Sequence, residues 1–133
     1  MTQETIVRVM ILSETYTPET ITQCTGLQCD KSWHVGDLRK HTRIVEKTHG
    51  WVLHSGLPKT ASLESHMEAI LRIFEPVKIA VKNLSMTETV EMSVVIYAPS
   101  EPALCFDKMT MERIAELGAG MDIDLYVWKK DSD

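Results

Sequence analysis

Two cysteines and a histidine fall within "CTGLQCDKSWHVGD", residues 24–37 of the chain. Cys24, Cys29 and His34 have the spacing C-x4-C-x4-H, and thiolates and imidazoles are the ligands that zinc prefers. Structural zinc sites use shorter cysteine spacings and a second, distant pair of ligands, whereas the remaining cysteine, Cys105, has no ligand motif beside it. We therefore predict neither a metal site nor a redox pair, and we expect Cys24 to be a small buried side chain of a helix.

The same segment contains a nucleophile, a base and an acid in Cys29, His34 and Asp37. Catalytic triads, however, are usually assembled from segments that are distant in the sequence. The chain also has no G-x-S-x-G, no phosphate-binding loop, no G-x-G-x-x-G and no H-E-x-x-H motif. The sequence therefore assigns no catalytic residue and no cofactor.

A second group of chemically capable residues lies in "MDIDLYVW", residues 121–128. Residues two apart on a strand point to the same side, so this alternation defines two faces. One face carries Asp122, Asp124, Tyr126 and Trp128. The other face is expected to belong to the core, and it carries Met121, Ile123, Leu125 and Val127. Two carboxylates at this spacing could hold a divalent cation or act as an acid/base pair, but a solvated face is favoured.

Tyr126 and Trp128 are large amphipathic side chains of the kind enriched in protein interfaces. If helices cover only one face of the sheet, Arg8 lies on the same open face as the two aspartates. We therefore predict a surface made of Arg8, Asp122, Asp124, Tyr126 and Trp128 that binds a protein with a basic patch. The alternative is a small hydrolase that uses Asp122 and Asp124, and a homodimer is also left open.

The segment 31–47 is locally basic, with five lysines and arginines against Asp37 and Glu46. A solvated loop and hairpin is the favoured interpretation, and docking of an acidic partner is the alternative. That second candidate surface consists of Trp33, His34, Arg39, Lys40 and Arg43.

Capping signals predict where helices begin and end. Thr17 precedes Pro18 and a glycine follows at position 26, which predicts a short helix between them. A second helix is predicted from Ser62 to the proline at 76, with His66 partly buried beside its apolar stripe. A third is predicted from Asp107 as the N-cap to a glycine at 118, and 77–86 is interpreted as a further short helix.

Strands are predicted where β-branched and apolar residues are concentrated, over 5–12, 88–99 and 121–128. Residues 41–56 are predicted to form a hairpin, with "KTHG" as its turn and Gly50 free to adopt a positive φ. These elements predict an α+β domain: a single mixed or antiparallel sheet of about five strands, with two to four helices mainly on one face.

Length and composition limit the remaining choices. The 133 residues, 44% hydrophobic and 25% charged, are typical of one globular domain spanning 1–133. A net charge of −5 disfavours nucleic-acid binding, because affinity for the backbone comes from neutralising phosphates. No stretch approaches the roughly 18 apolar residues of a membrane span, and the N-terminal residues lack the pattern of a signal peptide. We therefore expect a cytoplasmic protein with reduced thiols and no membrane or nucleic-acid partner.

The chain also resembles a widespread bacterial domain of unknown function. The likeness is carried by "YTPETIT" at 16–22, "GL" at 26–27, "GD" at 36–37, Trp51 and "IAELGAGMDIDLY" at 114–126, and it covers nearly the whole chain. Cys29 stands where relatives more often have proline, which disfavours a cysteine-based function. The resemblance implies an α+β fold and a bacterial origin, and it supplies no catalytic residue. Some small bacterial proteins of this kind neutralise toxins as immunity proteins, so the resemblance suggests immunity as a specific form of protein binding.

Overall fold

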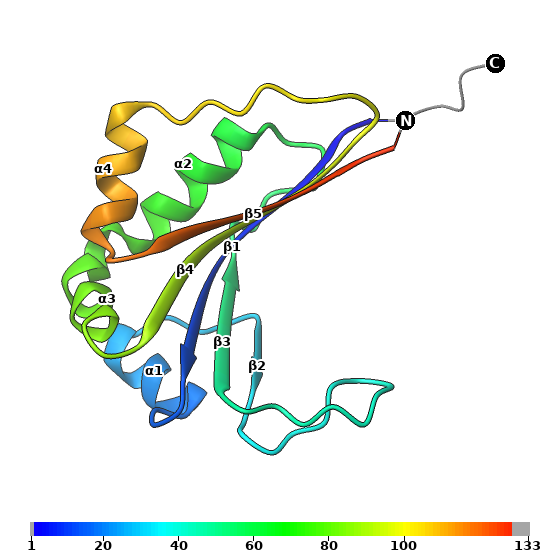
Figure 1. Ribbon diagram of the computed structural model, residues 1–133. Coiled ribbons are helices and arrows are strands. Elements are labelled where there is room, and N and C mark those ends of the chain that lie inside the picture. The colour runs from blue at the N-terminus through cyan, green and yellow to red at the C-terminus, as the bar shows by residue number, and fades with distance from the viewer. Residues whose placement is uncertain (1, 129–133) are drawn as a thin grey trace.

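The computed structural model describes residues 2–128, which form one mixed sheet with helices on one side of it (Figure 1). The elements in chain order are β1 (Glu4–Ser13), α1 (Pro18–Thr25), β2 (Lys31–Trp33), β3 (His49–His54), α2 (Leu63–Phe74), the 3-10 turn η1 (Glu75–Val77), α3 (Lys78–Ser85), β4 (Thr89–Ala98), α4 (Lys108–Glu116) and β5 (Gly120–Val127). The strand order is β2-β3-β1-β4-β5, with β5 parallel to β4 and all other pairs antiparallel. The predicted α+β fold is confirmed.

The helices begin at the residues that the capping signals predicted. The side chains of Thr17, Ser62 and Asp107 accept hydrogen bonds from the backbone N–H three residues later, at 3.2, 3.1 and 2.8 Å. Gly26 ends α1 in the left-handed conformation with φ of 73°, where a side chain would be strained. Local signals suffice here because a cap satisfies N–H groups that the helix itself leaves unpaired.

The core lies between the helices and one face of the sheet. β1 alternates between buried and partly exposed residues along its whole length, and its buried side chains face the helices. The fully buried Trp51 of β3 meets Phe74 of α2 edge to face, with ring centroids 6.2 Å apart. The other large buried apolar side chains of this layer include Val7, Val9, Ile11, Ile21, Met67, Ile70, Leu71, Met92, Val94 and Ile96.

The predicted hairpin over 41–56 is wrong. Residues 34–48 form a long connection with one isolated bridge, between Leu38 and Val45, and the strand that pairs with β3 on this side is the short β2. The reason is a close approach: a Cβ added to Gly50 would come within 2.0 Å of the Trp33 ring. Gly50 therefore lies within β3, where its lack of a side chain leaves room for the Trp33 indole, and no turn forms there.

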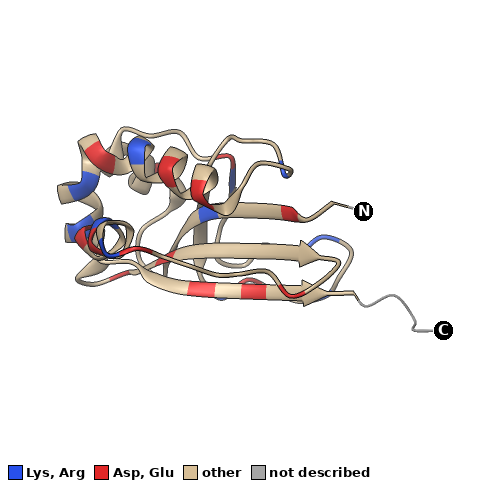
Figure 2. Cartoon of the chain, turned by 90° about the horizontal axis from the view of Figure 1, so that it is seen from above, with Lys and Arg blue, Asp and Glu red and all other residues tan. Residues whose placement is uncertain are grey.

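The expectation that one face of β5 lies in the core is also wrong. Met121, Ile123 and Leu125 point to the helix side of the sheet, yet 39%, 38% and 40% of each is exposed. α4, the crossover helix that leads into β5, packs mainly against α2 and α3. No helix therefore covers this edge strand as the inner strands are covered, as the view from above shows (Figure 2).

Two methionines on neighbouring strands test this account. Met92 of β4 is fully buried, and its register partner Met121 of β5 is 39% exposed. Replacing Met92 by alanine should lower the free energy of unfolding by about 2–5 kcal/mol, because it leaves a cavity. The same change at Met121 should cost about 1 kcal/mol or less. Chemical denaturation of dilute protein measures both, and equal losses would show that β5 is packed as tightly as β4.

Candidate functional site

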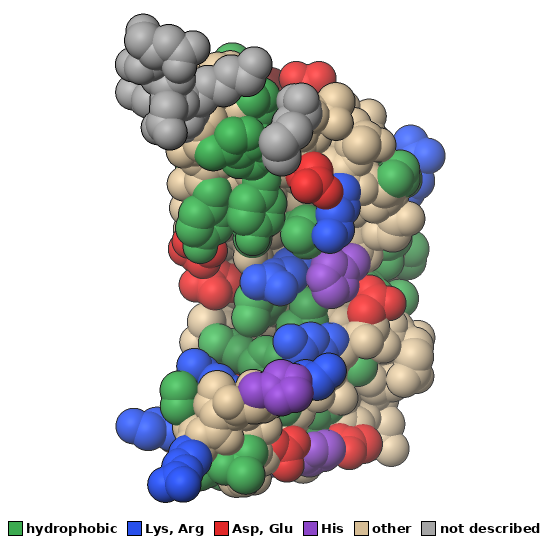
Figure 3. Space-filling view, turned by 90° about the vertical axis from the view of Figure 1, so that its right-hand side faces the viewer, with side chains coloured by type: hydrophobic (Ala, Val, Ile, Leu, Met, Phe, Trp, Pro, Cys, Tyr) green, Lys and Arg blue, Asp and Glu red, His purple; other side chains and the backbone are tan. Residues whose placement is uncertain are grey.

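One face of the sheet carries no helix among residues 2–128 (Figure 1), and Figure 3 shows the molecule from that side. Hydrophobic side chains gather at one end of this face, acidic side chains lie at its margin, and basic and histidine side chains cross its middle (Figure 3). We call it the open face, and its central strand contributes the side chains of Ile6, Arg8, Met10 and Leu12.

The first predicted surface lies at the β4–β5 end of the open face. The register places Arg8, Ser93 and Asp122 in one row across three strands. Arg8 donates a hydrogen bond from Nε to Ser93 Oγ at 3.3 Å, and Ser93 separates it from Asp122. Within residues 2–128, no ion pair involves Asp122 or Asp124, although Arg8 lies in the same row.

Tyr97 of β4 joins this surface and was missed from the sequence. Its ring stacks on Tyr126 with centroids 5.1 Å apart and planes 14° apart, and the two residues are 39% and 53% exposed. Alternation along β4 does place Tyr97 on the face of Ser93 and Val95, and in the structure it follows five consecutive buried residues as an exposed aromatic. Trp128 is half-buried and follows β5, with its backbone N–H bonded to the carbonyl of Ala98 at 3.0 Å.

The second predicted surface lies on the same face, at the opposite edge of the sheet. Trp33 packs over Gly50, and the Lys31 ammonium lies 5.7 Å from the centre of the indole ring. Beside them is a groove of about 800 Å³ between β1, β2 and the 34–48 connection. Its lining comprises Met10, Leu12, Lys31, Ser32, Trp33, Asp37, Leu38, Arg39, Lys40, Glu46 and Thr48. Arg39 is held by Glu46, with 2.8 Å between Nε and Oε1.

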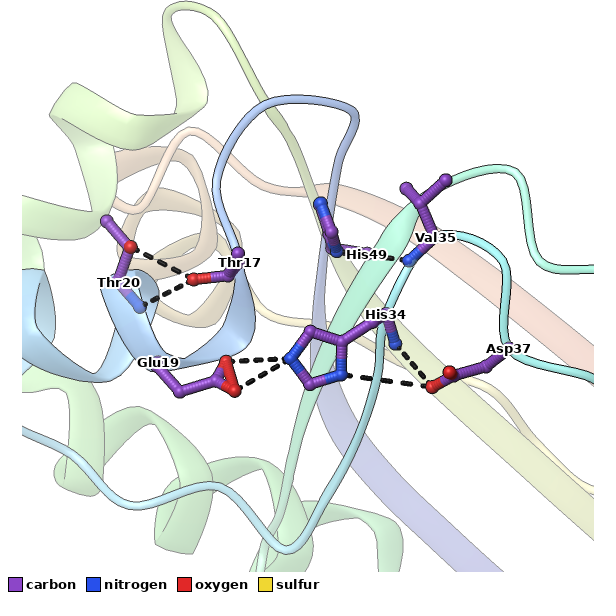
Figure 4. Close-up of polar contacts among 7 residues, drawn as sticks. All are labelled: Thr17, Glu19, Thr20, His34, Val35, Asp37 and His49. Carbon is purple, nitrogen blue, oxygen red and sulfur yellow. Dashed lines mark hydrogen bonds and ion pairs between the residues drawn. The ribbon is translucent and has the colours of Figure 1, made fainter.

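Two members of that surface, His34 and Arg43, are not among the residues that line the groove. His34 instead connects α1 to the long connection (Figure 4). Its Nε2 lies 2.7 Å from Glu19 Oε1, and its backbone N–H donates to Asp37 Oδ2 at 2.8 Å. A hydrogen bond from its own backbone N–H, followed by the contact with His34, lowers the pKa of Glu19. The histidine thus anchors the loop that forms one wall of the groove.

Cys24 and Cys105 are exposed and Cys29 is half-buried, and all three thiols are free. The expectation that Cys24 is buried is wrong, because α1 turns it toward solvent. In the described part of the chain, no three His, Cys, Asp or Glu side chains come together as a set of metal ligands.

Comparison with protein families matches residues 3–128 to the family described as a domain of unknown function, DUF4279. The chain belongs to this family. No curated protein and no solved structure matches it significantly. The family prediction is therefore confirmed, and it assigns no activity to any residue. No helix within residues 2–128 of this DUF4279 domain is both long and apolar enough to cross a membrane.

A buried polar pair lies apart from the open face of this DUF4279 domain. His66 of α2 is 1% exposed, more deeply buried than predicted, and its Nδ1 lies 2.6 Å from Ser55 Oγ. Because the backbone N–H of Leu57 donates to Ser55 Oγ at 3.3 Å, the hydroxyl is free to donate to Nδ1. The ring proton then sits on Nε2, which makes no hydrogen bond of normal geometry within the described residues, while an interaction with the backbone of Pro58 favours the charged form of the ring. Burial lowers the pKa of His66, because the core disfavours its charged form.

The stability of this DUF4279 domain should therefore depend on pH through His66. The unfolded chain takes up a proton near the ordinary histidine pKa of about 6.5, whereas the folded protein does so only at lower pH. The free energy of unfolding is thus fully present above that value and falls as the pH drops below it. Urea denaturation between neutral pH and the lowered pKa measures the slope, which His66→Gln should flatten. An unchanged slope in the variant would assign the pH dependence to other groups.

Proposed function

We propose that this DUF4279 protein is a non-catalytic protein-binding module that uses the β4–β5 end of its open face. The observation that carries the proposal is the stacked pair of Tyr97 and Tyr126, exposed together on a face without helices. Tyrosines lose little conformational entropy on binding, and a pair already stacked loses less. Aromatic side chains held in this way are typical anchors of interfaces.

Charge indicates the kind of partner. Asp122 and Asp124 border the tyrosines, and within residues 2–128 neither has an ion-pair partner. Accessible carboxylates beside an aromatic anchor complement a basic patch and speed the encounter with it. The specific form we propose is an immunity protein of a bacterial cytoplasm that neutralises a toxin with such a patch.

The alternative, a small hydrolase that uses Asp122 and Asp124, has less support. Both acids lie on an edge strand whose residues are exposed from Gly120 to Tyr126. Acid/base catalysis works best in a concave site that excludes water and positions the substrate. An exposed edge strand offers neither of these conditions.

A partner captured from the native host on immobilised protein allows the proposal to be tested with purified components. Trp128→Ala should weaken binding by about 2 kcal/mol or more, roughly 30-fold in the dissociation constant, as loss of an aromatic anchor does. Asp124→Asn should mainly slow association at low salt and reduce its salt dependence. Surface plasmon resonance across a range of salt concentrations measures both effects.

The matched control is Ile79→Ala, because Ile79 is an apolar residue of α3 that is 73% exposed on the helix side. It should bind the partner as the wild type does. If Trp128→Ala, with its fold intact, binds as tightly as this control, the β4–β5 end is not the binding site. Lys31→Glu and Lys40→Glu would then test the groove at the other end of the face.

A further inference from the structure

The outer edge of β5 carries backbone groups that no other strand of residues 2–128 meets. β5 pairs with β4 over eight consecutive residues, and within residues 2–128 no strand lies on its other side. The N–H of Trp128 bonds to β4, so the N–H and C=O groups of Asp122, Asp124 and Tyr126 also point toward β4. Those of Ile123, Leu125 and Val127 therefore point outward.

Several devices that usually protect an edge strand are missing from this one. Residues 120–127 contain no proline and no lysine, and the unbroken register shows no bulge. On the helix side, Ile123 and Leu125 keep 38% and 40% of their surface exposed. Asp122 and Asp124 are the only charges on the strand, and both lie on the open face. Such an edge is a template for the addition of another strand.

The sequence "DIDLYVW" is complementary to itself about Leu125. Consider a second copy of the strand that runs antiparallel to the first, related to it by a two-fold axis that passes through Leu125 perpendicular to the sheet. Residues that lie directly opposite each other then share a face of the sheet. On the open face, Asp122 then lies opposite Trp128 of the second copy, and Asp124 lies opposite its Tyr126. On the helix side, Ile123 lies opposite Val127, and Leu125 lies opposite itself. Within residues 122–128, every aliphatic residue thus meets an aliphatic one, and every acid meets an aromatic ring.

Other registers are less favourable. An axis at Asp124 places this carboxylate opposite its own copy. An axis at Ile123 places Asp122 opposite Asp124 of the second copy. Both registers are unfavourable because like charges directly opposite each other are destabilising. An axis at Tyr126 leaves a shorter overlap within residues 122–128. The axis at Leu125 also brings outward N–H groups against outward C=O groups, as an antiparallel ladder requires.

We propose that two copies of this chain pair through their β5 edges, antiparallel with Leu125 on the axis, to form one continuous sheet of ten strands. Because the axis runs perpendicular to the sheet, both open faces lie on the same side of the dimer. The stacked tyrosines of the two copies then form one surface across the junction. Because pairing requires no other protein, it can be tested on the chain alone, and its outcome is independent of the proposed partner binding.

Analytical ultracentrifugation of the chain alone, from dilute to near-millimolar protein, tests the pairing. The wild type should shift from monomer to dimer as its concentration rises. Leu125→Pro should remain a monomer, because it removes the outward N–H at the axis while leaving the bonds to β4. Ile123→Lys should also remain a monomer, because it places a charge in the apolar row.

Ile79→Lys is the matched control, since it introduces the same charge at an exposed isoleucine on α3 and should dimerise as the wild type does. Asp124→Asn should tighten the dimer several-fold, because it removes repulsion between acids that lie diagonally across the axis. Circular dichroism of the dilute variants establishes that each is folded. A wild type that stays monomeric, or a folded Ile123→Lys variant that pairs like Ile79→Lys, would overturn the proposal.

Cross-linking tests the register. In a background with Cys24→Ser, Cys29→Ser and Cys105→Ser, Leu125→Cys should form a disulfide between copies under mild oxidation, because directly opposed residues lie about 5.5 Å apart between Cα atoms. Ile123→Cys should not, because the two copies of that position lie four residues out of register. Efficient cross-linking of Ile123→Cys with none of Leu125→Cys would reject the register.

Discussion

The burial of the Trp51 indole is the interaction on which the rest of this structure depends. Its ring is fully buried, packs edge to face against Phe74, and donates from Nε1 to Thr22 Oγ1 at 3.0 Å. One side chain therefore joins β3 to both α2 and α1. Because an indole brings a large apolar area and one N–H that needs a partner, this site fixes how the two helices sit on the sheet.

As a consequence, the helices cover only one face of the sheet, and the other face is left available for binding. α2 packs against β1, α1 against β3 and α3 against β4, while α4 packs mainly on other helices. The opposite face is left to Arg8, to the stacked tyrosines and to the groove beside Trp33. Two surfaces that are about ninety residues apart in the sequence thus become the two ends of one face, acidic at the β5 end and carrying several cations at the β2 end.

The β2 edge and the β5 edge of the sheet differ in length and in what lies beside them. At the β2 edge, the strand is short and the long connection beside it is held in place by His34 and Glu19. At the β5 edge, eight residues end the sheet with apolar side chains on one face and acids on the other. An edge of that length carries a row of backbone groups with no partner among residues 2–128, and a second copy of the same strand could bond to them.

The sequence by itself determined where three helices begin and which residues alternate along the strands, because both depend on neighbours along the chain. Thr17, Ser62 and Asp107 cap their helices because a cap needs only the N–H three residues away. The alternation of β1 and β5 likewise predicted which residues share a face, including Asp122 and Asp124 with Arg8. The role of that face in binding remains a proposal.

Only the tertiary structure decided which segments meet and how deeply each is buried. The hairpin prediction failed because Trp33 and Gly50, seventeen residues apart, pack on each other and bring β2 beside β3. The core prediction for Met121, Ile123 and Leu125 failed because alternation identifies a face, whereas burial depends on where α4 packs. Tyr97 became part of the candidate site only when β4 and β5 were paired in parallel. Contacts of this kind join distant residues, so no local pattern encodes them.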